Sequence, residues 1–214
     1  MRVAAIVLLV SMIGALALTL RPDEPATDEP VADDDTPTID DLDGAAKELA
    51  ELLQADRQAT FHAVYEVTSS DFAGAAVSFE TWRRPPKVRS DIVVTKPDGV
   101  VRTRQLLLPD GAIACQQADD TPWQCTRTPE VNDPFQGDIL EQVAAAEKVT
   151  AEDRVIDGRN VRCFTLTQPD ITAEFCATDN GVPVLVQSAG TSLKLVSLEE
   201  EVGEVFEPPA EPLA

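Results

Sequence analysis

Apolar and polar residues alternate in short segments through the middle of the chain, and turn residues separate the segments. The turn signals are Pro97-Asp98-Gly99, Pro109-Asp110-Gly111, Asp119-Asp120-Thr121, Asp157-Gly158, Pro169-Asp170, Asn180-Gly181 and Ala189-Gly190. The segments of strand length include residues 60–68, 75–82, 87–96, 100–108, 161–167, 171–177, 182–188 and 192–198. Strands at this spacing, joined by hairpin turns, predict an antiparallel meander of roughly ten strands.

Two further segments have apolar residues at helical spacing. The first covers about residues 44–55, with Asp43 as its expected N-cap, and the second begins at Asp138, where Glu141 completes a capping box. Their apolar residues are Leu42, Ala45, Leu49, Leu52 and Leu53 in the first and Leu140, Val143, Ala144 and Val149 in the second. Such stripes are typical of helices that cover one face of a sheet. The pattern therefore predicts an α+β fold with two short helices.

Several predicted strands are apolar on both faces, as residues 92–94, 106–108 and 184–186 illustrate. An antiparallel sheet with one solvated face would alternate instead. The excess apolar surface would line either a closed core or a ligand cavity, and the pattern does not distinguish the two.

The chain begins with Met1 and Arg2 and continues with an uncharged, mostly apolar run, residues 3–20. A helix of this length reaches about 27 Å, close to the thickness of a bilayer core. The segment 1–21 is therefore either a cleaved signal peptide or an uncleaved membrane anchor. Both interpretations place the rest of the chain outside the cytoplasm.

Charge divides the remaining sequence. The chain has 38 acidic and 17 basic residues, a formal net charge of −21. Residues 22–43 contain ten acids, four prolines and no base, which is typical of a disordered spacer. We therefore expect one folded domain at residues 44–208, followed by an acidic tail at residues 209–214. A surface this acidic excludes nucleic acid as a partner, because that interaction needs clustered bases.

The basic residues concentrate in one short segment. It contains Arg83, Arg84, Lys87 and Arg89. The cluster is either an ordinary solvated hairpin end or a patch that contacts anionic lipid headgroups, where each near-surface base contributes about 1 kcal/mol.

The four cysteines fall into two close pairs. A hairpin about Pro169-Asp170 sets Cys163 opposite Cys176, and a hairpin about Asp120 brings Cys115 to Cys125. In an exported chain, such pairs predict two disulfides. Neither pair has the spacing of a zinc site, so no metal is expected.

Little in the chain suggests catalysis. It has one histidine, His62, and lacks a phosphate-binding glycine loop or a nucleophile elbow. We expect His62 to be a hydrogen-bonded strand residue and expect neither an enzyme nor a cofactor.

Residues 61–85 resemble the opening of the LolA/LppX-like superfamily of bacterial envelope carriers. In that family a strand ending in Trp precedes basic residues and Pro, as Trp82 precedes Arg83, Arg84 and Pro85 here. The similarity continues with a hairpin at 107–111, with Pro134-Phe135 before a helix, and with a terminal strand that closes on Phe206.

The resemblance implies an incomplete antiparallel barrel, a strongly curved sheet whose concave face two or more helices close over an apolar cavity. It implies an extracytoplasmic, membrane-anchored domain that binds acyl chains of a lipid, glycolipid or lipoprotein, or a secreted one if the signal is cleaved. The alternative is an RseB-like regulatory module that binds a membrane protein partner. Apolarity and strand phase give these expected lining residues: Leu49, Leu53, Phe61, Val77, Phe79, Val93, Leu107, Leu140, Val143, Phe164, Leu185 and Val186.

Overall fold

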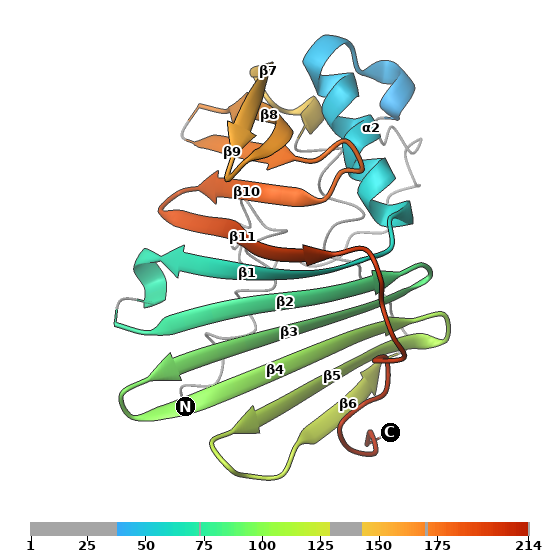
Figure 1. The fold of residues 1–214 in the computed structure, drawn as a ribbon, viewed down its shortest axis with the longest axis vertical. Coiled ribbons are helices and arrows are strands. Elements are labelled where there is room, and N and C mark those ends of the chain that lie inside the picture. The colour runs from blue at the N-terminus through green and yellow to red at the C-terminus, as the bar shows by residue number, and fades with distance from the viewer. Residues whose placement is uncertain (1–37, 73, 129–142, 170, 214) are drawn as a thin grey trace, which may run out of the picture.

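The computed structural model of the protein describes residues 38–72, 74–128, 143–169 and 171–213, and these residues form one eleven-stranded antiparallel sheet (Figure 1). The strands are β1 (Phe61–Ser69), β2 (Ala76–Arg84), β3 (Lys87–Lys96), β4 (Gly99–Leu108), β5 (Gly111–Ala118), β6 (Gln124–Thr128), β7 (Lys148–Ile156), β8 (Arg159–Thr167), β9 (Thr172–Ala177), β10 (Pro183–Ser188) and β11 (Thr191–Glu199). The helical elements are η1 (Ile39–Asp41), α2 (Gly44–Gln58) and η2 (Ser70–Phe72).

The sheet order is β6-β5-β4-β3-β2-β1-β11-β10-β9-β8-β7. Each half of the chain forms a run of hairpins, and the halves meet where β1 pairs with β11. That ladder contains a bulge between Val64 and Tyr65, because Val64 faces Ser197 whereas Tyr65 faces Leu195. The sheet does not close, so β6 and β7 are its edges.

The predicted meander is confirmed, since each predicted strand corresponds to a strand of the structure. The prediction that Val149 belongs to the second helix is wrong, because Val149 lies in strand β7. Lys148–Ile156 mixes apolar and polar residues in a pattern that favours neither helix nor strand clearly, and its pairing with β8 decides the outcome.

The first predicted helix is confirmed as α2, which continues three residues beyond its expected end. Asp43 occupies the N-cap position, but its side chain makes no capping hydrogen bond there. Its carbonyl oxygen instead accepts from the amides of Ala46 and Lys47. The short helix η1 lies within the segment expected to be a spacer, and the Thr38 amide and hydroxyl both donate to Asp41 there.

Most of the second predicted helix, including Leu140, lies outside the described residues. Val143 and Ala144 are helical at its end. The expectation of two or more helices is therefore not shown. The predicted signal or anchor at residues 1–21 also lies outside the described part. Within that part, none of the helices combines the length and apolarity needed to cross a bilayer.

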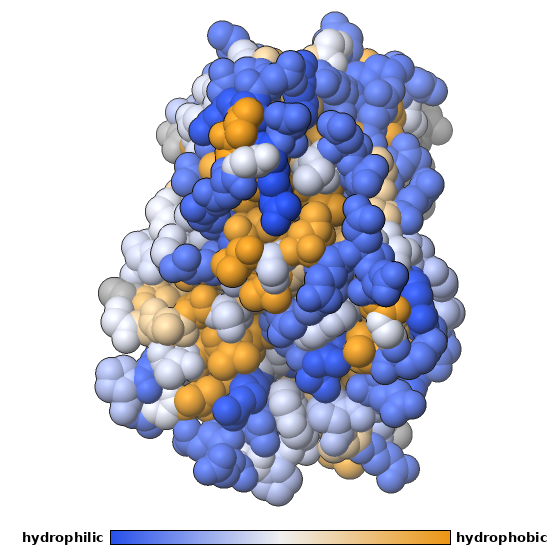
Figure 2. Space-filling model, in the orientation of Figure 1, coloured by the Kyte–Doolittle hydropathy of each residue, from blue (hydrophilic) through white to orange (hydrophobic). Residues whose placement is uncertain are grey.

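The strand registers define two faces of the sheet. We call the face that contacts α2 the helix face and the opposite face the strap face. The strap is the segment 200–213, which leaves β11 and passes in front of the right-hand ends of the next strands (Figure 1). The view of Figure 2 is mostly hydrophilic, with an apolar band across β11 and β1. The bulge residue Val196 is 62 % exposed.

Candidate functional site

Apolar side chains on the helix face form a row that crosses eight neighbouring strands. In register order they are Phe164, Phe175, Val186, Leu193, Val67, Val77, Val94 and Val101, from β8 to β4. Directly opposite residues have Cβ atoms about 4.5–5.5 Å apart, so the row is continuous. No polar side chain interrupts it among these eight positions.

A second row on the same face lies one pleat further along the strands. Tyr65 faces Phe79, with ring centroids 5.6 Å apart, and Phe79 faces Ile92. Burial raises the pKa of Tyr65 strongly, the negative charge of Asp56 raises it further, and Arg83 opposes both. Tyr65 is therefore neutral and extends the apolar face.

Helix α2 covers the β7–β9 end of this face. Leu49 forms a buried cluster with Val143 and Phe164, and Leu52 and Leu53 pack against it. At the other end of the helix, Arg83 Nη2 lies 3.5 Å from Asp56 Oδ2 and links α2 to β2.

The turn between β9 and β10 also contacts α2. Gly181 has φ +81°, and a Cβ placed on it would lie 2.6 Å from the Asp56 amide nitrogen and closer still to the Leu52 carbonyl oxygen. The helix is therefore held at both sheet halves, by Gly181 on one side and Arg83 on the other.

The register places most of the predicted lining residues on the helix face. These are Phe61, Val77, Phe79, Leu107, Phe164 and Val186 on the strands, with Leu49, Leu53 and Val143 in the cluster beneath α2.

The register places the other two predicted lining residues on the strands, Val93 and Leu185, on the strap face. Val93 lies between Ile92 and Val94, and three consecutive branched residues give no phase. Leu185 follows a bulge in the β9–β10 ladder, which reverses the alternation at that point. A sequence pattern does not reveal either effect.

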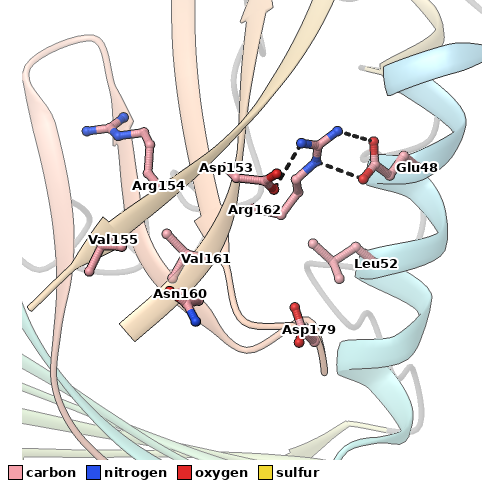
Figure 3. A pocket seen from close by; sticks show the side chains of 9 residues that line it. All are labelled: Glu48, Leu52, Asp153, Arg154, Val155, Asn160, Val161, Arg162 and Asp179. Carbon is pink, nitrogen blue, oxygen red and sulfur yellow. Dashed lines mark hydrogen bonds and ion pairs between the residues drawn. The ribbon is translucent and has the colours of Figure 1, made fainter. Parts of the chain in front are cut away.

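A pocket of about 780 Å³ opens between α2 and the β7–β8 hairpin (Figure 3). Its lining residues are Glu48, Leu52, Asp153, Arg154, Val155, Asn160, Val161, Arg162 and Asp179. Arg162 donates to both oxygens of Glu48 at 2.8 and 2.9 Å and to Asp153 at 3.0 Å. These hydrogen bonds raise the pKa of Arg162, and the bond that Arg162 donates to Glu48 has the largest effect.

The sequence interpretation did not include this pocket. A hairpin about the Asp157-Gly158 turn places Asp153 opposite Arg162, so the turn signal predicts the part of the pocket that lies on β7 and β8. Nothing in the sequence places Glu48 beside them. The lining offers carboxylate, guanidinium, amide and aliphatic groups, which can bind a ligand but include no nucleophile beside a base.

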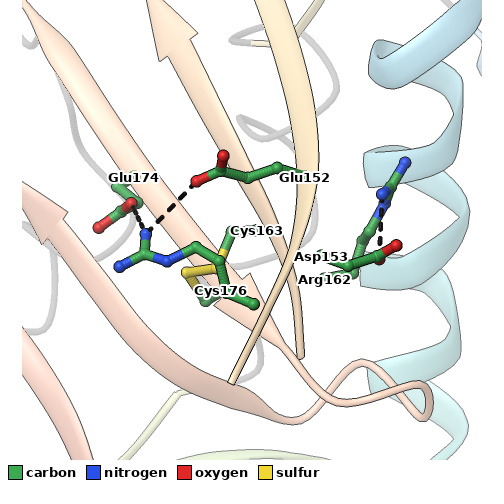
Figure 4. Close-up of a disulfide and its surroundings, with 7 residues drawn as sticks. Glu152, Asp153, Arg162, Cys163, Glu174 and Cys176 are labelled. Atoms are coloured by element: carbon green, nitrogen blue, oxygen red, sulfur yellow. Dashed lines mark hydrogen bonds and ion pairs between the residues drawn. A yellow bond between two sulfur atoms is a disulfide. The ribbon is translucent and has the colours of Figure 1, made fainter. Parts of the chain in front are cut away.

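Both predicted disulfides are present, Cys115–Cys125 and Cys163–Cys176, and each joins directly opposite strand residues. Arg154 donates to Glu174 and lies 3.8 Å from Glu152. Figure 4 shows Glu152 and Glu174 in the surroundings of the second disulfide. All four cysteines are buried. Two disulfides indicate an oxidising, extracytoplasmic compartment.

The four predicted patch residues divide between the two faces. Arg83 is 6 % exposed on the helix face, whereas Arg84, Lys87 and Arg89 lie on the strap face. Arg84 donates to Glu204 at 2.6 Å, and the Arg89 guanidinium lies 4.0 Å from the Trp82 ring centroid. They therefore do not form one solvated patch, and the alternation of β2 is the reason.

Asp91 is the centre of an ion cluster on the strap face. Arg89 Nε and Arg104 Nε donate to it at 3.0 and 2.8 Å. Burial alone would raise the pKa of Asp91, but the hydrogen bonds and charges of the two arginines outweigh it and lower that pKa.

We expect this cluster to make stability depend on pH in acid. The pKa of Asp91 is lower in the folded state than its ordinary value of 3.8. The ionised carboxylate therefore stabilises the fold fully at pH values above 3.8, and this stabilisation is lost as the pH falls through the folded-state pKa. The free energy of unfolding of wild type should exceed that of Asp91→Asn by about 2 kcal/mol at pH 7. Urea unfolding should show this difference shrinking below pH 3.8. An unchanged difference in acid would contradict the assignment.

His62 lies on the strap face with a carboxylate oxygen at each ring nitrogen. Nε2 is 2.7 Å from Glu80 and Nδ1 is 3.3 Å from Glu199, and the ring stacks on Trp82. The expectation of a hydrogen-bonded strand histidine is confirmed. The described residues contain no group of three or more His, Cys, Asp or Glu that could hold a metal.

Comparison with solved structures finds this fold elsewhere. A chain of the Pseudomonas aeruginosa MucA/MucB complex gives a TM-score of 0.50 at 19 % identity over 72 % of this chain and 56 % of that chain. LprF from Mycobacterium bovis gives 0.46 at 15 % identity over 78 % and 97 %. An uncharacterized conserved protein from Thermus thermophilus gives 0.48 at 10 % identity over 74 % and 88 %.

This chain therefore spans just over half of the matched chain from the MucA/MucB complex. No protein-family model matches the sequence, and no curated protein is similar to it in sequence. At such identities the likeness concerns the fold alone. The open sheet, the α2 cover and the match to the MucA/MucB chain together show that this chain shares the fold of that matched chain.

Proposed function

We propose that the protein binds the acyl chains of a lipid, glycolipid or lipoprotein along the helix face, outside the cytoplasm of a bacterium, and catalyses no reaction. The observation that carries this proposal is the uninterrupted apolar row from Phe164 to Val101. The fold likeness supports it, because LolA/LppX-like proteins are lipoprotein carriers.

The size of the row suits an acyl chain. Eight strands at about 4.8 Å spacing extend for about 34 Å, whereas the acyl chains of one leaflet extend for about half of a 30 Å bilayer core. Each methylene moved from water to an apolar surface contributes about 0.8 kcal/mol, so about ten of them would supply about 8 kcal/mol. The row can therefore provide useful affinity without any polar contact.

Entry of an acyl chain requires α2 to move, because the helix covers one end of the row. Its polar attachments are the Glu48–Arg162 pair, at which both side chains are partly exposed, and the inner Asp56–Arg83 pair. The outer pair is the easier to separate, since solvent replaces its hydrogen bonds. We infer that the N-terminal half of α2 opens first.

The row can be tested with two matched double variants. Val101→Gln/Val186→Gln places amides at two half-buried positions of the row, whereas Val93→Gln/Val100→Gln does so at two half-buried positions of the strap face. The first should weaken binding of a fluorescent fatty-acid probe about tenfold, equivalent to about 1.4 kcal/mol, and the second should leave it near wild type.

The same experiment has a clear negative outcome. Equal affinities for the two double variants, with thermal midpoints alike, would contradict binding on the helix face. Native mass spectrometry of protein purified from its own membrane should in addition show a bound lipid.

A second candidate function follows from the match to the MucA/MucB complex. That match, to a chain solved in complex with another protein, favours a module that binds a protein partner, and we propose a membrane protein as that partner. Capture of one defined membrane protein together with no transfer of lipid between vesicles would favour this function over the first.

A further inference from the structure

The strap is the feature that the proposed acyl site leaves unexplained. It leaves β11 after Glu199, crosses β2 and β3 on the strap face, and ends beside β6 (Figure 1). It carries five acids and no base: Glu200, Glu201, Glu204, Glu207 and Glu211. Apart from the single bridge of Leu213, it forms neither helix nor strand.

The strap contacts β2 and β3 through three consecutive residues. Glu204 accepts a hydrogen bond from Arg84 at 2.6 Å, and the Val205 carbonyl oxygen accepts one from Arg89 Nη1 at 3.0 Å. Phe206 is 6 % exposed, and the charged ends of Arg84 and Lys87 lie 5.4 and 5.8 Å from its ring centroid. An acid two residues before an aromatic residue is therefore the pattern that this surface holds.

The remainder of the strap reaches the sheet edge. Ala210 and Trp123 both pack against the buried cluster of Leu106, Ile113, Cys115 and Cys125. The Leu213 amide donates to the Cys125 carbonyl at 2.9 Å, and its own carbonyl accepts from Arg127 at 3.3 Å. These are the backbone bonds that an added strand makes at an open sheet edge.

The surface beneath the strap is basic on an acidic protein. Arg84, Lys87, Arg89 and Arg104 give four positive charges and Asp91 gives one negative charge, which leaves 4 − 1 = +3 before the strap is added. Of the nearby acids, Glu80 and Glu199 are engaged by His62. An acidic segment therefore meets favourable charge at this surface.

The strap is held weakly enough to be replaced. The Glu204 side chain is 78 % exposed, and Leu213 is 71 % exposed and pairs through one residue only. Phe206 is the only buried residue among residues 200–213, and a segment with so few buried apolar contacts opens locally without global unfolding. Detachment would break no ladder between the eleven strands.

We propose that this surface is a docking groove for an extended acidic segment of a partner protein, and that the strap is its internal ligand in the free chain. The partner segment places a carboxylate on Arg84 and, two residues later, an aromatic ring against Lys87, and it pairs with the backbone of β6. Docking lies on the opposite face from the proposed acyl site, so the two proposals fail independently.

The test uses the full chain with a weakened strap, Glu204→Gln/Phe206→Ala, and a synthetic peptide of residues 200–213 as the probe. Trp82 stacks with Arg89, which donates to Val205, and Trp123 packs against the same cluster as Ala210, so tryptophan fluorescence should report binding. The peptide should bind the weakened chain at least about tenfold more tightly than wild type, because a tethered segment competes at about millimolar effective concentration. A peptide with the same two substitutions should bind neither chain, and a Glu211→Gln chain should behave as wild type.

Equal binding of the peptide to both chains, or no binding to the weakened chain, would overturn the proposal. Binding of the weakened chain to anionic vesicles that the peptide fails to displace would assign the surface to a membrane, and a concentration-dependent dimer of wild type would assign it to a second copy. If the weakened chain does not fold, hydrogen exchange of wild type decides: amides of the strap should be much less protected than those of β3 and β4, and equal protection would refute a replaceable strap.

Discussion

Replacing Gly181 with alanine should detach the C-terminal half of α2 from the sheet. The added Cβ would lie 2.6 Å from the Asp56 amide nitrogen, and the atoms it meets are helix backbone, which cannot rotate away. Overpacking of this kind costs about 1–3 kcal/mol, and the left-handed conformation at φ +81° adds about 1 kcal/mol for any side chain. The free energy of unfolding should therefore fall by about 2–4 kcal/mol.

Gly158→Ala is the matched control. Gly158 has φ +78°, nearly the same backbone conformation, but nothing lies within 4 Å of a Cβ placed there. Gly158→Ala should lower the free energy of unfolding only through the unfavourable left-handed backbone conformation, by about 1 kcal/mol. Urea unfolding measures both values, and hydrogen exchange should show lost protection in α2 for the Gly181 variant alone. Equal effects of the two substitutions would mean that the helix does not depend on this contact.

Asp91→Ala should destabilise the sheet by about 3–5 kcal/mol at neutral pH, because it leaves two mostly buried guanidinium groups without their shared carboxylate. The side chains of Arg89 and Arg104 are 13 % and 18 % exposed, so water compensates for little of the loss. Thermal or urea unfolding at pH 7 measures the change.

Asp110→Ala provides the comparison for an exposed ion pair. Asp110 accepts from Arg127 at 2.8 Å, but both side chains are largely in solvent. Exposed pairs contribute about 0–1 kcal/mol, so this variant should remain close to wild type. A similar loss for the two aspartates would contradict the view that burial makes the Asp91 cluster important.

The sequence predicted the parts of the fold that depend on neighbouring residues. Turn residues such as Asn180-Gly181 separate the strands where hairpins occur, and symmetry about the Pro169-Asp170 turn paired Cys163 with Cys176 correctly. Hairpin pairing follows from turn position, because the register of two adjacent strands is fixed by the loop that joins them. Helix α2 likewise followed from its apolar stripe.

The features that were missed depend on contacts between distant segments. The phase of Leu185 changes at a bulge, Glu48 meets Arg162 only after α2 docks, and Glu204 meets Arg84 only when the strap folds back. The residues next to each position do not indicate any of these contacts. In an acidic chain, Glu48 and Glu204 cannot be distinguished by sequence from acidic residues that face solvent. Composition alone identifies the basic cluster, whereas only the strand register shows that its residues divide between the two faces of the sheet.

The ladder between β1 and β11 has a consequence for how the molecule assembles. Every other ladder between the described strands joins consecutive strands and closes a short loop, so both halves can form early as separate stacks of hairpins. The β1–β11 ladder brings together residues as far apart as His62 and Glu199, and it is expected to close last. Since the row on the helix face crosses this ladder between Leu193 and Val67, an intermediate with separate halves would have no acyl site and would expose two half-sites to aggregation.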